Sequence, residues 1–198
     1  MAGSSENGWT LDEQRRAFAE SRFLAMPLAG TIAWAVVGLC GLFLPTGLLV
    51  WILFIATGSI FYLGLLLSRF TGEDLLGRKG PKNFFDQLFF STVVMALLVY
   101  AIAIPFFFVE PTSLPLTVGI LAGLMWVPFS TMIGHWIGLF HSIARTVLVL
   151  AAWYAFPEHR FVAIPAVIVV VYLVTIWVLE RREISRPGPG DQAEGTPS

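Results

Sequence analysis

The residues best suited to chemistry lie in one apolar stretch near position 140, where histidine, serine and arginine interrupt the apolar residues. An α-helix turns about 100° per residue, so the side chains of four residues in this stretch would lie within about 60° of one another around the helix axis. These residues are Gly134, Gly138, His141 and Arg145. Ser142 lies on the flank of this stripe. An arginine at the centre of a membrane helix costs roughly 2.5–3.5 kcal/mol, so it must face other helices or a water-filled cavity. The stripe predicts either an anion or substrate contact in a polar cavity or a structural pairing inside a bundle.

Three residues elsewhere are candidates to line the same cavity. Thr57 and Ser59 lie midway along another apolar stretch, where small polar residues are also typical of helix packing. Asp86 begins a third stretch and is a candidate partner for Arg145 or Lys82. An acid at that position also suits the positive end of a helix dipole, so the two roles of Asp86 stay open.

Metal, haem and hydrolase chemistry find no support in the sequence. His135 and His141 are six residues apart, about 240° around a helix, so they cannot hold a metal from one face. His-Glu-x-x-His, Gly-x-Ser-x-Gly and phosphate-loop motifs are absent. The lone cysteine, Cys40, has no partner for a disulfide or a metal site. We therefore expect no catalytic residue, no metal and no cofactor.

The elements that position these residues are apolar stretches long enough to cross a bilayer, which takes about 20 residues of helix. Hydrophobic residues make up 57% of the 198 residues, and charged residues only 13%, against about 25% in soluble domains. Continuous runs of this length favour helices over the alternating strands of a barrel. We predict an all-α, polytopic transmembrane bundle of six helices within a domain at 23–180, with spans at 24–44, 48–68, 87–109, 114–133, 136–156 and 161–179.

Three features refine this scheme. The run at 114–156 is twice the length that a bilayer needs, so we place a turn at Gly134 and His135. Pro105, Pro128 and Pro165 each free a backbone carbonyl and can kink a helix. Glycines let neighbouring helices approach closely, so we assign helix packing to four of them: Gly38, Gly41, Gly134 and Gly138.

The two ends are polar. Residues 1–22 form a cytoplasmic segment with a short helix, because Thr10 and Glu13 have the spacing of a capping box. This helix either lies on the membrane surface or leads directly into the first span. Residues 181–198 are charged and then rich in Pro and Gly, which predicts a disordered cytoplasmic tail.

The charge distribution predicts the orientation. With six spans, one side of the membrane holds ten of the twelve Lys and Arg residues: Arg15, Arg16, Arg22, Arg69, Arg78, Lys79, Lys82, Arg181, Arg182 and Arg186. The other side holds Arg160. Basic residues favour the cytoplasmic face, so both ends are predicted to be cytoplasmic. A net charge of −1 argues against a nucleic-acid partner. The expected partner is the lipid bilayer, and a homo-oligomer or another membrane subunit stays open.

The chain also resembles a family of small bacterial membrane proteins of about 200 residues whose function is uncharacterised. The resemblance rests on Gln14–Phe18, on the basic loop at Gly77–Gly80 and on the stretch bearing His141 and Arg145. It extends from Leu11 to Glu180 and implies a bacterial inner membrane and a six-helix bundle.

Three functions remain open. A small permease or channel-like protein predicts a water-accessible path to Arg145, with Thr57, Ser59 or Asp86 nearby. A non-catalytic scaffold or accessory subunit predicts that Arg145 is buried and fully paired, with no cavity. An intramembrane enzyme would need a second reactive group within hydrogen-bond reach of His141, and the sequence offers none.

Overall fold

A computed structural model describes residues 9–75 and 83–182, and this part of the chain contains helices and no strand. The predicted all-α class is therefore confirmed. In chain order the helices are α1 (Leu11–Ala19), α2 (Ala25–Gly41), α3 (Thr46–Gly58), α4 (Ile60–Thr71), α5 (Phe84–Leu98), α6 (Tyr100–Val109), α7 (Leu114–Gly123), α8 (Trp126–Ile133), α9 (Ile137–Ala155) and α10 (Arg160–Arg181). Short 3₁₀ turns, η1 (Pro111–Ser113) and η2 (Pro157–His159), precede α7 and α10.

The helices identify a membrane protein with four or five candidate spans among the described residues. Four segments are long and apolar enough to cross a bilayer: Phe84–Val109, Pro111–Ile133, Ile137–Ala155 and Pro157–Arg181. The pair α3 and α4 makes a fifth if its 48° bend lies within one span. The first predicted stretch, 24–44, forms only the 17-residue helix α2. It falls short mainly at its C-terminal end, where the helix stops at Gly41 and Leu42 to Leu44 turn the chain towards α3. Before it, Phe23 adopts a left-handed backbone conformation with φ of 56°, which separates α1 from α2.

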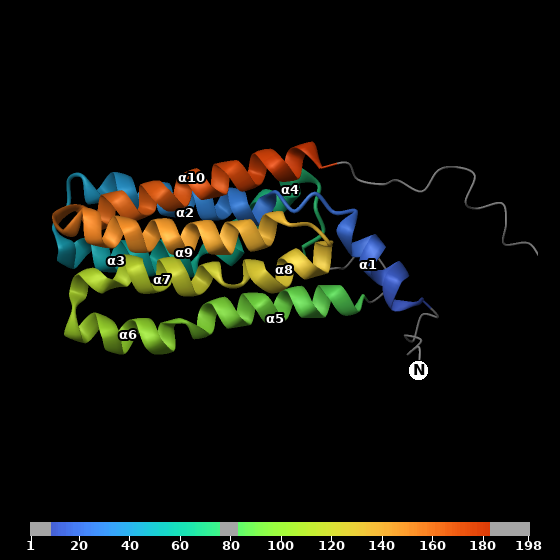
Figure 1. The fold of residues 1–198 in the computed structure, drawn as a ribbon, viewed down its shortest axis with the longest axis horizontal. Helices are drawn as coiled ribbons and strands as arrows, with labels where there is room; N and C mark the ends of the chain where they lie inside the picture. The colour runs from blue at the N-terminus through green and yellow to red at the C-terminus, as the bar shows by residue number, and fades with distance from the viewer. Residues whose placement is uncertain (1–8, 76–82, 183–198) are drawn as a thin grey trace, which may run out of the picture.

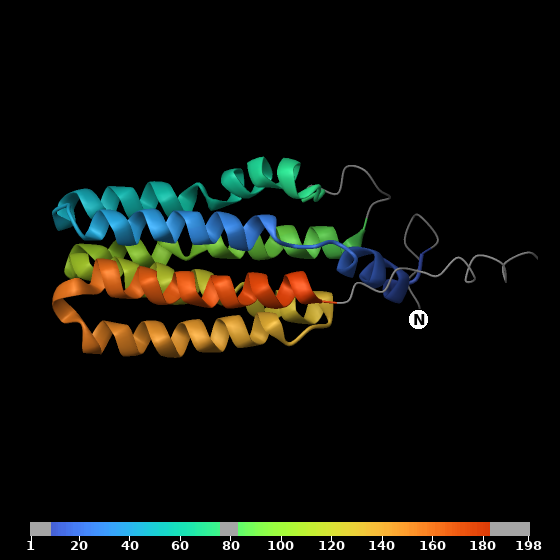
Figure 2. The same ribbon diagram turned by 90° about the horizontal axis from the view of Figure 1, so that it is seen from above.

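The long helices run along one common axis (Figures 1 and 2). In Figure 1, α1 and the C-terminal end of α10 lie at the same end of the bundle, and the α2–α3, α6–α7 and α9–α10 connections lie at the other. Helix α2 packs against α10, α3 and α4, while α9 packs against α10, α7 and α8. The stripe on α9 therefore faces the inside of the bundle.

Helix α1 packs against α5 and α8 and is separated from α2 by residues 20–24. The predicted capping box is confirmed, since Thr10 and Glu13 bond to each other's backbone N–H groups. The side-chain oxygen of Gln14 accepts from the backbone N–H of Phe84 at 2.9 Å. Arg182 donates to the carbonyls of Ala19 and Ser21 at 2.8 and 2.7 Å. These bonds tie α1 to the starts and ends of the spanning helices.

A carboxylate from a distant loop caps the start of α2. Glu73 accepts from the backbone N–H groups of Leu24 at 2.8 Å and Ala25 at 3.2 Å. These donors have no partner within the helix, and a negative charge suits the positive end of the helix dipole. The start of α2 is thus fixed by a residue that lies 49 positions later in the chain.

Helices α8 and α9 are separated at Gly134 and His135, where the sequence predicts a turn. Gly134 adopts a left-handed conformation with φ of 63°, and the N–H of His135 donates to the carbonyl of Ser130 at 3.1 Å. The N–H of Ile137 donates to Nδ1 of His135 at 3.2 Å, which requires an unprotonated nitrogen. Burial, and then the nearby charge of Arg182, lower the pKa of His135 and favour this neutral ring.

Replacing Gly134 with alanine is expected to destabilise the protein by about 1–2 kcal/mol, because a Cβ is disfavoured in the left-handed region. Thermal unfolding in detergent, followed by circular dichroism, measures the loss. Gly47→Ala is the matched control, because no atom lies within 4 Å of a Cβ built there and Gly47 has ordinary helical geometry. Equal stability of the two variants would contradict the role assigned to Gly134.

Candidate functional site

Arg145 lies in the middle of the bundle, eight residues after the start of α9 and ten before its end. Its side chain is 1% exposed. Nε donates to the carbonyl of Gly119 at 2.6 Å, and Nη1 donates to the hydroxyl of Tyr172 at 3.1 Å. The guanidinium also lies 5.5 Å from the ring centroid of Trp34 and 5.4 Å from that of Tyr172, within range of a cation–π attraction. Arg145 is therefore held by dipoles and aromatic faces from three other helices.

No carboxylate among the described residues forms a salt bridge with Arg145. Guanidinium has five N–H donors, and the bonds to Gly119, Tyr172 and His141 use only Nε and Nη1. Within the described part of the chain, Nη2 donates to nothing. An arginine stays protonated in proteins, so a buried positive charge persists here with unused donors.

His141 lies one turn before Arg145 and is fully buried. Its Nδ1 is 2.8 Å from the hydroxyl of Thr175, which already donates its proton to the carbonyl of Val171. The hydroxyl must therefore accept from Nδ1–H, which leaves Nε2 as the acceptor that faces Nη1 of Arg145 at 3.5 Å. The ring also stacks on Trp126 with centroids 4.3 Å apart. His141 orients Arg145 as a neutral ring.

Glycines provide the space for these large side chains. A Cβ on Gly123 would lie 2.8 Å from Cδ of Arg145, and a Cβ on Gly30 would lie 2.6 Å from the hydroxyl oxygen of Tyr172. Ser142 donates to the carbonyl of Gly123 at 2.9 Å, which satisfies an acceptor at the end of α7. The small residues of α2, α7 and α9 thus bring the arginine and its aromatic neighbours into one layer.

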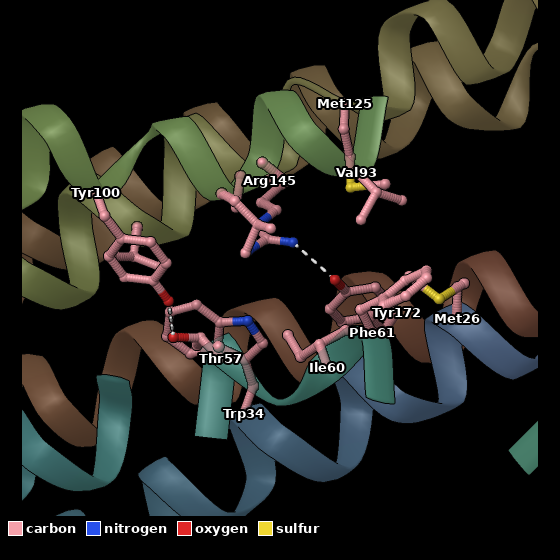
Figure 3. A pocket seen from close by; sticks show the side chains of 15 residues that line it. Met26, Trp34, Thr57, Ile60, Phe61, Val93, Tyr100, Met125, Arg145 and Tyr172 are labelled. Atoms are coloured by element: carbon pink, nitrogen blue, oxygen red, sulfur yellow. Dashed lines mark hydrogen bonds between the residues drawn. The ribbon is translucent and has the colours of Figure 1, made fainter. Parts of the chain in front are cut away.

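Arg145 borders an open-mouthed cavity of about 60 Å³ (Figure 3). Helices α2 to α7, α9 and α10 contribute the lining: Met26, Trp34, Thr57, Gly58, Ile60, Phe61, Val93, Ala96, Leu97, Tyr100, Val118, Ala122, Arg145 and Tyr172, with Met125 from the segment between α7 and α8. Tyr100 donates to Thr57 at 2.6 Å, because the Thr57 hydroxyl already donates to the carbonyl of Leu53. Two polar corners, Arg145 with Tyr172 and Tyr100 with Thr57, flank an otherwise apolar space.

Three helix breaks surround this cavity. Helices α3 and α4 separate at Ser59, α5 and α6 at Val99, and α7 and α8 at Leu124 and Met125. A Gly-Ser pair is a common site of sharp bends, and Gly58 and Ser59 form one here. Pro128 has no N–H to bond the carbonyl of Leu124, so it explains the α7–α8 break. Residues at or next to each break, Gly58, Tyr100 and Met125, line the cavity.

The structure separates the predicted site residues into several groups. Arg145 and Thr57 line the cavity, whereas His141 and Ser142 lie behind Arg145 and do not. Ser59 does not line it, and its hydroxyl donates to the carbonyl of Ala56.

Asp86 is not brought to Arg145. It lines a separate small cavity with Glu73 and Asp74, near the end of the bundle where α1 lies. Asp86 precedes the first α5 residue of the Arg145 cavity, Val93, by seven positions, about 10 Å along the helix axis. The other partner considered for Asp86, Lys82, lies outside the described residues.

The four glycines assigned to packing all lie at close contacts. A Cβ on Gly38 would lie 3.1 Å from the ring of Pro165, and one on Gly41 would lie 2.5 Å from the carbonyl of Phe161, so both lie where α2 meets α10. Gly138 abuts the backbone of α8, and Gly134 lies against Arg15. Helix α10 continues through Pro165 without a break.

Sequence reasoning missed the aromatic half of the site, Trp34, Tyr100 and Tyr172. Nothing in the spacing of these residues along their own helices links them to Arg145. One available signal was the pair Gly119 and Gly123, four residues apart, which is the pattern of a close helix contact. That pattern would have directed attention to α7 as the partner of α9.

Comparison with known proteins identifies a family whose function is unknown. A model of the family of unknown function DUF7010 matches residues 11–182. No curated protein and no solved structure matches the chain. Among the described residues, no group of three or more His, Cys, Asp or Glu could hold a metal ion.

Proposed function

We propose that this chain, which belongs to the DUF7010 family of unknown function, is a small permease or channel-like protein that conducts an anionic solute. The observation that carries the proposal is the position of Arg145. It is a buried cation without a carboxylate partner among the described residues, it has unused donors, and it borders an open cavity at the centre of the bundle. Intramembrane charges are costly, and they mark solute pathways when they face a cavity.

The broken helices support the same proposal. Transporter sites near the bilayer midplane are typically built where membrane helices are interrupted, because irregular backbone is tolerated where it borders a cavity. Here residues at or beside three breaks, Thr57, Tyr100 and Met125, line the cavity that Arg145 borders. A purely structural pairing of Arg145 would not need this space.

We further propose six spans, with both ends in the cytoplasm of a bacterial cell and the protein in its inner membrane. Both ends of the described chain lie at one end of the bundle, which favours an even number of crossings (Figure 1). That end carries six described arginines, Arg15, Arg16, Arg22, Arg69, Arg181 and Arg182. The opposite end carries Arg160, and basic residues favour the cytoplasmic side. In this arrangement α2 and the bent α3–α4 pair each count as a span.

Uptake into liposomes tests the proposed function. Purified protein is reconstituted, and uptake of radiolabelled methanesulfonate and p-toluenesulfonate is measured under an inside-positive membrane potential and under a pH gradient. Both probes carry a permanent negative charge, so they cross pure lipid slowly. We expect uptake of at least one anion above protein-free liposomes, and we expect Arg145→Gln to remove it.

Arg160→Gln is the matched control, because it removes an arginine at the end of the bundle, where the side chain contacts Thr112 and the Trp153 ring. It should retain uptake. The proposal is refuted if the wild-type protein takes up neither anion, or if Arg145→Gln takes up as much as the wild type.

A non-catalytic scaffold or accessory subunit is the alternative, and one observation favours it. The span Phe84–Val109 is only 17% buried, whereas the other three long spans are 39–44% buried. Its exposed face could receive a second copy or another membrane subunit. Cross-linking in native membranes, followed by mass measurement, distinguishes the two, because a scaffold predicts a stoichiometric complex and no uptake.

A further inference from the structure

Resting on the proposed function, we infer that the ligand is an amphipathic monoanion, with a compact oxyanion head and an apolar body, that reaches Arg145 from the bilayer between α4 and α5. The inference joins two observations. The cavity is mostly apolar around one cationic corner, and Leu97, a lining residue midway along the span Phe84–Val109, is half exposed.

The chemistry of the lining selects the ligand. Arg145 offers unused guanidinium donors, and these match the oxygens of a carboxylate or sulfonate. The other polar groups on the lining side chains are the hydroxyls of Thr57, Tyr100 and Tyr172 and the indole N–H of Trp34, so a second negative charge would lack a cationic partner among the described lining residues. Most of the wall is hydrocarbon, aromatic ring or thioether. A small hydrophilic anion would lose its water there without gaining enough contacts, whereas an apolar body would bury itself.

The mouth opens sideways. Leu97 lines the cavity and is 49% exposed, although it lies midway along the span Phe84–Val109. Ile60 and Phe61 line the cavity from α4, and both are half-buried. An exposed side chain at mid-span contacts acyl chains and not water. The cavity therefore communicates with the lipid at this level.

Helices α4 and α5 make a natural boundary for this mouth. Helix α4 packs mainly on α2, and the 48° bend between α3 and α4 occurs at the cavity. The rings of Phe61 and Phe90 meet edge to face with centroids 6.0 Å apart, which places one aromatic contact across the boundary. Small movements of these two side chains would widen the opening without disturbing the bonds of Arg145.

The first test compares two anions with the same head. In the liposome assay above, we expect p-toluenesulfonate uptake to exceed methanesulfonate uptake by about tenfold or more, since the aromatic body buries apolar area. Equal or faster uptake of methanesulfonate, with loss in Arg145→Gln, would overturn the amphipathic ligand and leave the proposed function intact. Absence of both uptakes would overturn both proposals.

The second test closes the mouth. In a Cys40→Ala background, Phe61→Cys and Phe90→Cys are joined by a bis-methanethiosulfonate reagent whose links dithiothreitol cuts. We expect p-toluenesulfonate uptake to fall to the level of protein-free liposomes and to recover on reduction. Each single-cysteine variant treated with the same reagent is the control and should retain uptake. Unchanged uptake with the link in place would overturn access from the bilayer.

A third variant covers the case in which the double cysteine variant does not fold. Ala122→Leu fills the cavity without removing any bond of Arg145, whereas Ala101→Leu adds the same atoms to an exposed position on α6. We expect only Ala122→Leu to lower p-toluenesulfonate uptake, by about tenfold or more. Equal uptake by the two variants would overturn the assignment of the ligand to this cavity.

Discussion

Arg145→Leu is expected to leave the protein folded, within about 1–2 kcal/mol of the wild type, while anion uptake falls to the level of protein-free liposomes. Two effects of similar size oppose each other in the folded state. Removing a charge from mid-helix relieves roughly 2.5–3.5 kcal/mol. Losing the bonds to Gly119, Tyr172 and His141 costs about 1 kcal/mol each, and more where the donor is charged. The carbonyl of Gly119 lies inside α7 and keeps its helical partner, which limits the loss.

The measurement is thermal unfolding and oligomeric state in detergent, alongside the uptake assay. A functional arginine is retained at a cost in stability, so an unchanged or more stable variant without uptake is the expected result. Loss of the fold in Arg145→Leu would instead show that the arginine is a structural pairing. Tyr172→Phe is a useful companion, because it removes one hydroxyl of the site and keeps the ring over Arg145.

Gly138→Val is expected to prevent stable folding, with a loss of several kcal/mol. A Cβ at this position would touch the carbonyl of Trp126 and would lie 2.8 Å from the backbone nitrogen of Ser130. These are backbone atoms of α8, so no side-chain rotation relieves the overlap, and overpacking by flexible side chains alone already costs about 1–3 kcal/mol. Helix α9 would have to move away from α8 and would carry His141 and Arg145 with it.

Expression, monodispersity in detergent and the unfolding midpoint measure this effect. Gly47→Val is the matched control, because the space around its Cβ is open and only the modest helix preference of valine changes. A Gly138→Val protein as stable as this control would show that α8 and α9 are not in the close contact described here.

The sequence was sufficient to predict the half of the candidate site that lies on one helix, α9. Gly138, His141, Ser142 and Arg145 share a face because helical periodicity places them there, and the structure buries that face. The other half could not be predicted, because Trp34, Tyr100 and Tyr172 reach the site through the packing of separate helices. The proposed link between Asp86 and Arg145 failed for the same reason, since sequence gives depth only approximately and gives no helix neighbours.

The span count shows a similar limit. Each of the six predicted stretches contains helix, and the turn at Gly134 lies where length alone requires one. Hydropathy did not show that α3 and α4 bend by 48°, or that α2 ends at Gly41, three residues before the end of the predicted span. At the boundary before the first span, the ring of Phe23 packs against Phe18 and Phe129, with centroids 4.7 and 5.1 Å away.

The short helix α2 has a consequence for the surrounding lipid. Its 17 residues extend only about 25 Å, against a hydrocarbon thickness of about 30 Å. The Glu73 carboxylate at its first turn cannot follow the helix into acyl chains without losing hydration. In the six-span arrangement proposed above, the bilayer would thin beside α2, which would make the protein sensitive to membrane thickness and favour membranes with shorter acyl chains.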